Sequence, residues 1–179
     1  SFLRTEKPRH PQLLLLEGRC YEQESVPYKA FDGIIEELVR QLRDGRLLAS
    51  HELSSDDISA LTRLFPALQK LPGLALVDDP RVGKIADARE QRDRAFSALR
   101  KLLCWLGSLR PLVLFVDDLQ WADEDSGALL LHILEPKVSP TMMVLLTLRA
   151  DEIQTSPLLR WLHPKLIGLH SAELQVHRV

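Results

Sequence analysis

The sequence predicts an α/β fold in which a mostly parallel β-sheet is flanked by helices. Short apolar runs, typical of strands buried on both faces, alternate with segments whose apolar residues recur at helical spacing. The predicted order is strand, helices, strand, helix, strand, helix, strand, and this alternation is typical of a parallel sheet with helical connections. The 179 residues are 45% hydrophobic and 27% charged. This is the composition of one globular domain.

The first predicted strand is the apolar run from Gln12 to Gly18, which ends at the glycine, where we expect a tight turn. A helix follows, since the apolar residues between Phe31 and Leu42 fall on one face. We expect a helical insert over about 46–84. Within it, residues 54–57 can cap a short helix through Leu64, and prolines and glycines interrupt the rest.

The second half of the chain contains the clearest strand and helix patterns. Residues 87–109 carry one apolar stripe and are predicted to be a helix. The next elements are a strand at 112–116, a helix from about 123 to 134 with acids in its first turn, and a strand at 142–147. Residues 157–162 can form a short helix and residues 173–179 a last strand.

Composition and cysteine spacing exclude several classes of protein. A formal net charge of −2 argues against a direct nucleic-acid site, and the apolar runs are far too short to span a bilayer. The two cysteines, Cys20 and Cys104, lie far apart and outside any metal-binding spacing. Two unpaired thiols suit a reducing cytoplasm, and we expect Cys20 to be a small buried residue rather than a nucleophile.

Polar groups that could do chemistry follow two of the predicted strands. Asp117 and Asp118 come directly after the strand at 112–116, and Arg149 follows the strand at 142–147. Ligands of open parallel sheets bind at the carboxyl ends of the strands. One acid there could anchor Mg²⁺, the other could orient a water for attack on a γ-phosphate, and the arginine could stabilise the transferred group.

Other interpretations of the acid pair stay open on the residues alone. Asp117 and Asp118 could be solvated acids at a strand exit that cap the next helix. Paired aspartates also occur at 56–57 and 78–79. The pair at 78–79 follows a short apolar run that is poor in β-branched residues and bracketed by Pro72 and Pro80, which makes it the weaker candidate.

Three segments, in order, resemble a known family. Residues 112–123, Leu-Val-Leu-Phe-Val-Asp-Asp-Leu-Gln-Trp-Ala-Asp, resemble the Walker B segment of the STAND class of P-loop ATPases, in its AAA-like, origin-recognition-like branch. Residues 16–22 with 25–28 are similar to the second-strand region of these proteins, and residues 147–152 resemble their sensor 1 strand end. Members occur in bacterial multidomain signalling proteins, including Ser/Thr kinase fusions and large transcription activators.

The resemblance implies a role for each site residue. Asp117 would be the Mg²⁺-associated carboxylate, Asp118 the water-orienting acid, and Arg149 the sensor of the γ-phosphate. The alternative for Arg149 is a local ion pair with one of the acids at 151 and 152. Trp121 is interpreted as a packing residue, and Asp123 is either a helix cap or a catalytic group.

One departure from the family is large, because the chain has no Walker A. The only Gly-Lys, at 83–84, is followed by isoleucine and lacks the first glycine of G-x-x-x-x-G-K-[ST]. Ser1 to Leu3 read like the tail of the helix that follows the P-loop, so we expect a truncation upstream of Ser1 that removes the loop and the first strand. Residues 1–179 would then be a single partial AAA-like ATPase domain.

These expectations imply an ATP-binding and ATP-hydrolysing nucleotide switch, with ATP and Mg²⁺ as cofactors, in a larger signal-transduction protein. Its partners would be kinase, repeat or DNA-binding domains of the same parent chain, with ATP-dependent self-association. The alternative is a degenerate domain that serves only as an interaction scaffold. A phosphoacceptor receiver domain is disfavoured, because it needs its acid pair on the first strand.

Overall fold

Three parallel strands form the sheet in the computed structural model, which describes residues 10–22, 26–42, 53–71, 73–74, 87–134 and 142–169. The strands are β1 (Leu14–Arg19), β2 (Leu112–Asp117) and β3 (Met142–Leu146), in the spatial order β1-β2-β3. The prediction of a mostly parallel sheet with flanking helices is confirmed.

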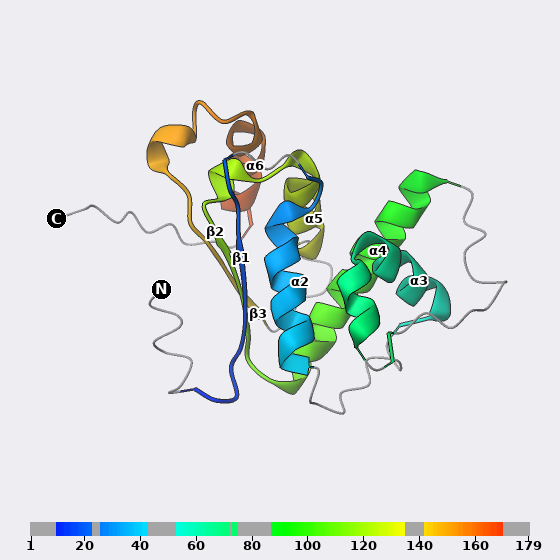
Figure 1. Cartoon of the computed structure of the whole chain (residues 1–179). Coiled ribbons are helices and arrows are strands. Elements are labelled where there is room, and N and C mark those ends of the chain that lie inside the picture. Colours follow the sequence, from blue (N-terminus) through cyan, green and yellow to red (C-terminus); the bar gives the residue numbers. More distant parts are fainter. Residues whose placement is uncertain are drawn as a thin grey trace.

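Five helices and three short 3₁₀ turns accompany the sheet in the described ranges, and α2, α4 and α5 lie on the same side of it (Figure 1). The helices are α2 (Lys29–Leu42), α3 (Ser55–Leu64), α4 (Ala88–Leu109), α5 (Glu124–Leu134) and α6 (Pro157–Ile167). The turns are η3 (Pro66–Lys70), η4 (Leu119–Trp121) and η5 (Ala150–Glu152). The last helix is longer than the sequence predicts.

The two faces of the sheet differ in burial. Because side chains alternate along a strand, Leu112, Leu114 and Val116 point to one face, where each is at most 2% exposed. The other face is more exposed to solvent, since Phe115 is only half-buried and Met143 on β3 is 56% exposed. The core therefore lies between one face of the sheet and the helices that cover it.

Gly18 brings α2 against β1, and the expectation of a tight turn at this residue is wrong. Gly18 lies inside the strand, and a Cβ atom on it would stand 2.2 Å from the carbonyl oxygen of Ala30. Gly33 faces the same contact, because its Cβ would lie 3.0 Å from the carbonyl oxygen of Glu17. The two glycines allow helix and strand backbones to approach more closely than side chains would permit.

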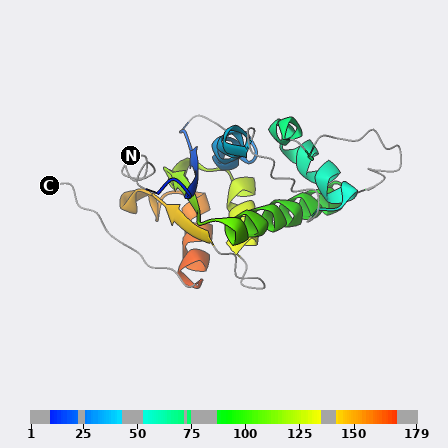
Figure 2. The same ribbon diagram turned by 90° about the horizontal axis from the view of Figure 1, so that it is seen from below.

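Helices α3 and α4 form a lobe that extends away from the sheet (Figure 2). The predicted cap of the first is confirmed as a capping box between Ser54 and Asp57. Asp57 is 8% exposed and accepts a hydrogen bond from Lys101 Nζ at 2.8 Å, while Arg94 Nη1 lies 2.8 Å from Asp56 Oδ2. Both paired acids at 56–57 are therefore structural and join α3 to α4.

The stability of this lobe should depend on acid pH through Asp57. Burial acts to raise the pKa of this carboxyl group, but hydrogen bonds from Lys101 and Ser54 outweigh it, so the pKa is lowered from 3.8. A lowered folded-state pKa stabilises the fold above the unfolded value, and this stabilisation is lost as the pH falls through the folded value. Asp57→Asn should cost about 1 kcal/mol at neutral pH.

Chemical denaturation at a series of pH values measures this effect. The difference in unfolding free energy between the wild type and Asp57→Asn should shrink as the pH falls below about 4. Asp56→Asn is the matched control and should cost less at neutral pH, because its carboxylate is half-exposed. A difference for Asp57→Asn that is constant with pH would contradict this account.

Neither Cys20 nor Cys104 is in a disulfide, and Cys20 is 2% exposed, as expected for a small buried residue. Burial also raises the pKa of the Cys104 thiol. Within the described ranges, no helix combines the length and the apolar character that crossing a membrane requires. The expected helix tail at Ser1–Leu3, the acid pair at 78–79, Gly83-Lys84 and the last strand at 173–179 lie outside the described residues.

Candidate functional site

The acid pair lies at the carboxyl end of the central strand. Asp117 is the last residue of β2, and Asp118 follows it with φ 58° and ψ 45°, in the left-handed region. Aspartate tolerates this conformation better than most residues, and here it turns the chain out of the sheet into η4. The two side chains are 36% and 31% exposed, so both carboxylates are accessible from solvent.

Thr147, directly after β3, holds this turn in place. Its hydroxyl donates to Asp117 Oδ1 at 2.5 Å and accepts from the backbone N–H of Asp118 at 3.0 Å. Its backbone N–H donates to Val116 O at 3.0 Å, and its carbonyl oxygen accepts from Leu119 N at 2.9 Å. Four hydrogen bonds made by one threonine thus fix the acid pair against the end of β3.

Arg19 is a member of the site that the sequence analysis missed. It ends β1 in register with Asp117, and its Nε and Nη2 donate to Asp118 Oδ2 at 3.2 and 3.1 Å. Its Nε also lies 3.8 Å from Asp117 Oδ2. The available signal was its place at the end of the first predicted strand, since the carboxyl ends of parallel strands meet at one edge.

Arg149 reaches the acid pair through its backbone. Its N–H donates to Gln120 Oε1 at 3.2 Å, and Gln120 Nε2 donates to Asp118 Oδ1 at 3.2 Å. The guanidinium instead pairs with Asp151, with Nη2 3.2 Å from Oδ2. The local ion pair considered from the sequence is therefore present. Both partners are more than half exposed, so the pair contributes under about 1 kcal/mol and does not decide the role of the arginine.

Asp123 is a helix cap, and it caps two helices at once. Its Oδ1 accepts from Ser126 N in α5 at 2.8 Å and from Tyr28 N at 3.0 Å. Its Oδ2 accepts from Lys29 N at 3.1 Å and from the Ser126 hydroxyl at 2.5 Å. The carboxylate therefore joins the starts of α2 and α5. Trp121 packs against the core, in agreement with its interpretation as a packing residue.

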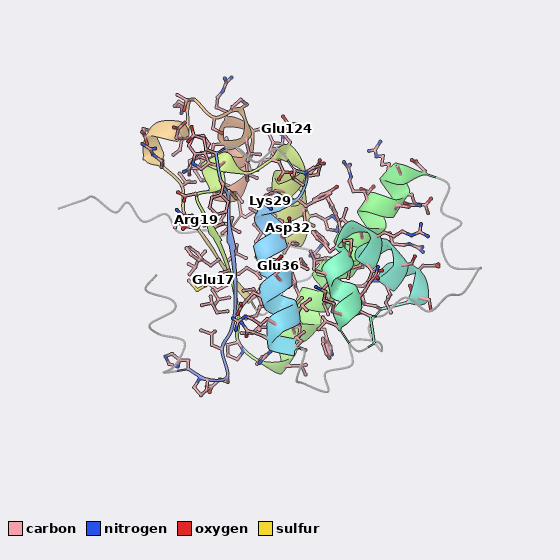
Figure 3. The ribbon with its side chains drawn as sticks, viewed as in Figure 1. Glu17, Arg19, Lys29, Asp32, Glu36 and Glu124 are labelled. Carbon is pink, nitrogen blue, oxygen red and sulfur yellow. The ribbon has the colours of Figure 1, made fainter. Side chains whose placement is uncertain are left out.

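A polar cavity of about 690 Å³ adjoins the site on the β1 side. Figure 3 shows the charged side chains of β1 and α2 that line it, Glu17, Arg19, Lys29, Asp32 and Glu36. Asp117 also lines it, whereas no residue of β3 does. Arg149 and Thr147 follow β3, so the cavity lies on the other side of Asp117 from them.

The acid pair also has room for a further ligand. The described contacts place no hydrogen-bond donor on Asp117 Oδ2, since its nearest cation is Arg19 Nε at 3.8 Å. Asp118 Oδ1 accepts one hydrogen bond, from Gln120, and a carboxylate oxygen can accept two. Each acid thus has one oxygen that can bind a cation or a water.

Comparison with known proteins gives one result. No curated protein and no solved structure matches the chain. A family model described as an AAA ATPase domain matches residues 1–145, which is most of the chain and includes the three strands up to Leu145. This family binds nucleotides and uses ATP, typically with Mg²⁺. The chain therefore belongs to the AAA ATPase domain family.

Proposed function

We propose that this chain is the acid-bearing part of a STAND-class ATPase domain that acts as a nucleotide switch in a larger signalling protein. One observation carries the proposal. In a member of the AAA ATPase domain family, paired carboxylates lie at the carboxyl edge of a parallel sheet and contact the ends of both neighbouring strands. This edge is where open parallel sheets bind their ligands.

Asp117 is the proposed anchor for Mg²⁺, and its surroundings fit that ion. Mg²⁺ in nucleotide sites is held by one or two carboxylates together with waters and phosphates, so a single accessible carboxylate oxygen is sufficient from this part of the protein. Thr147 donates to Oδ1 of Asp117, and the described contacts place no hydrogen-bond donor on Oδ2. When bound, the ion would neutralise charge on the phosphates.

Asp118 is the proposed water-orienting acid and Arg149 the proposed γ-phosphate sensor. The carboxylate of Asp118 accepts from Arg19 and Gln120, whereas Oδ1 of Asp117 accepts from Thr147, so the two acids have different hydrogen-bond donors. The guanidinium of Arg149 is 57% exposed and, among the described residues, is held by one exposed partner, Asp151. It can exchange that partner for a more highly charged phosphate at little cost.

The groups that bind the phosphates are proposed to come from a P-loop upstream of Ser1 in the parent protein. The sequence contains no G-x-x-x-x-G-K-[ST], and the described acid pair has one arginine partner, Arg19. In the described sheet β3 is an edge strand with no fully buried residue, which also supports a further neighbour. On this proposal residues 1–179 are a single partial AAA-like domain with a helical insert at about 46–84.

The proposed partners are ATP and other domains of the parent chain, with ATP-dependent self-association. Cys20 and Cys104, which are not in a disulfide, support a reducing cytoplasm as its compartment.

Arg149→Ala in the parent protein tests the proposed function through nucleotide discrimination. The substitution should lower ATP affinity or turnover and leave ADP affinity nearly unchanged, because only ATP offers a γ-phosphate. Titration calorimetry with both nucleotides measures the difference. Arg160→Ala, an exposed arginine on α6, is the matched control and should alter neither affinity. An equal loss for ATP and ADP, or a loss of thermal stability alone, would assign Arg149 a structural role.

A further inference from the structure

Gln120 lies between the acid pair and the segment that carries Arg149. It is 5% exposed, and both ends of its side-chain amide are used. Its Nε2 donates to Asp118 Oδ1 at 3.2 Å, and its Oε1 accepts from the backbone N–H of Arg149 at 3.2 Å. One buried side chain therefore spans the distance from the end of β2 to the segment that follows β3.

The two partners require an amide, or its chemical equivalent, at this position. A carboxylate only accepts hydrogen bonds and a backbone N–H only donates them, so the bridging group needs one donor and one acceptor. The amide has a single orientation that satisfies both. Leaving a buried donor or acceptor without its hydrogen bond costs free energy. A displacement of Asp118 or of the Arg149 N–H that breaks one hydrogen bond of the amide is therefore opposed by the hydrogen bond at its other end.

We propose that Gln120 is a positioning residue that couples the backbone at Arg149 to the carboxylate of Asp118. This inference rests on the proposed function, in which Arg149 reads the γ-phosphate and Asp118 orients the water. When the guanidinium of Arg149 leaves Asp151 and binds the phosphate, the backbone N–H of Arg149 moves with it. Gln120, which accepts from that N–H, transmits the movement to Asp118 Oδ1. Hydrolysis is thereby made sensitive to the presence of the γ-phosphate.

The link itself can be measured in the 179-residue chain without nucleotide, by hydrogen exchange of single backbone amides in a ¹⁵N-labelled sample. Gln120→Leu should accelerate exchange at the Arg149 N–H by about tenfold, because a hydrogen bond to a buried group is lost. Leu119 N–H, which donates to Thr147 O at 2.9 Å, is the internal control and should keep its protection.

A double-mutant cycle then tests the coupling. Asp118→Ala should accelerate Arg149 exchange when Gln120 is present and have no further effect in the Gln120→Leu background. Equal acceleration in both backgrounds, an unchanged Arg149 amide in Gln120→Leu, or equal acceleration at Leu119 would overturn the proposal. Equal acceleration at Leu119 would mean that the substitution unfolds this part of the chain locally.

Two further substitutions separate the ends of the amide. Gln120→Glu keeps an acceptor for Arg149 but, when ionised, has no donor for Asp118 and repels it. Arg149 should therefore stay protected, and Asp118→Ala should no longer accelerate its exchange. Gln120→His, whose neutral ring has one donor and one acceptor, should restore the response. A Gln120→Glu variant in which Asp118→Ala still accelerates exchange at Arg149 would contradict the assigned orientation.

The catalytic arm uses the parent protein. Gln120→Glu should lower kcat for ATP about tenfold with little change in KM, because binding is kept and only Asp118 is misplaced. Gln120→His should restore most of kcat, and a KM effect with unchanged kcat would overturn the proposal. If the exchange cycle shows coupling but Asp118→Asn hydrolyses ATP like the wild type, the proposed function fails while the link stands.

Discussion

Replacing Asp123 with alanine should destabilise the fold more than substitution of any neighbouring acid. The carboxylate accepts from Ser126 N at 2.8 Å and from Tyr28 N and Lys29 N at 3.0 and 3.1 Å, so its loss uncaps two helices that are far apart in sequence. Loss of one cap costs about 0.5–2 kcal/mol, and we expect a total of about 2–4 kcal/mol. For a chain of this size that lowers Tm by about 5–15 °C.

Thermal and chemical denaturation measure this loss, with Glu124→Ala as the matched control. Glu124 is the next residue, exposed in the first turn of α5, and its removal should cost under about 1 kcal/mol. Asp123→Asn keeps one acceptor oxygen and should give an intermediate loss. If Asp123→Ala is no less stable than Glu124→Ala, the carboxylate does not join α2 to α5.

Asp118→Asn in the parent protein should retain nucleotide and Mg²⁺ while hydrolysis slows by about a hundredfold or more. The amide still accepts a hydrogen bond from Gln120 but lacks the negative charge that polarises water. Asp117→Asn should instead weaken the metal-dependent part of nucleotide binding. Steady-state turnover together with nucleotide binding, with and without Mg²⁺, separates the two effects.

Asp56→Asn provides the control for these two variants. It belongs to another pair of aspartates, lies on α3, and contacts Arg94, so it should leave turnover unchanged. Wild-type turnover in both Asp117→Asn and Asp118→Asn would show that the Walker B assignment is wrong.

The strands could be predicted from sequence because their patterns are local. The β-rich run at 112–116 is bounded by Pro111 and the acid pair, and the structure ends β2 one residue later, at Asp117. The role of Gly18 could not be predicted from the local pattern. Its role depends on the close approach of Ala30 on another element, and a glycine at the end of an apolar run has the same local signature as a turn.

The candidate site could be predicted only where its residues follow a local strand pattern. The strand ends located Asp117, Asp118 and Arg149, whereas the pairing of Arg19 with Asp118 depends on register between strands almost a hundred residues apart in sequence. The capping of α5 by Asp123 is local, but its bonds to Tyr28 and Lys29 are not. Long-range hydrogen bonds leave no periodic pattern in the sequence.

Titration calorimetry with ATP and Mg²⁺ on the 179-residue chain, beside the parent protein, tests most directly the claim that these residues form the acid-bearing half of a nucleotide site. Without a P-loop, the carboxylates of Asp117 and Asp118 leave the charge of the triphosphate unneutralised and repel it. The account predicts weak or undetectable binding to the chain and strong, Mg²⁺-dependent binding to the parent. Low-micromolar binding to the chain alone, or no binding to the parent, would contradict it.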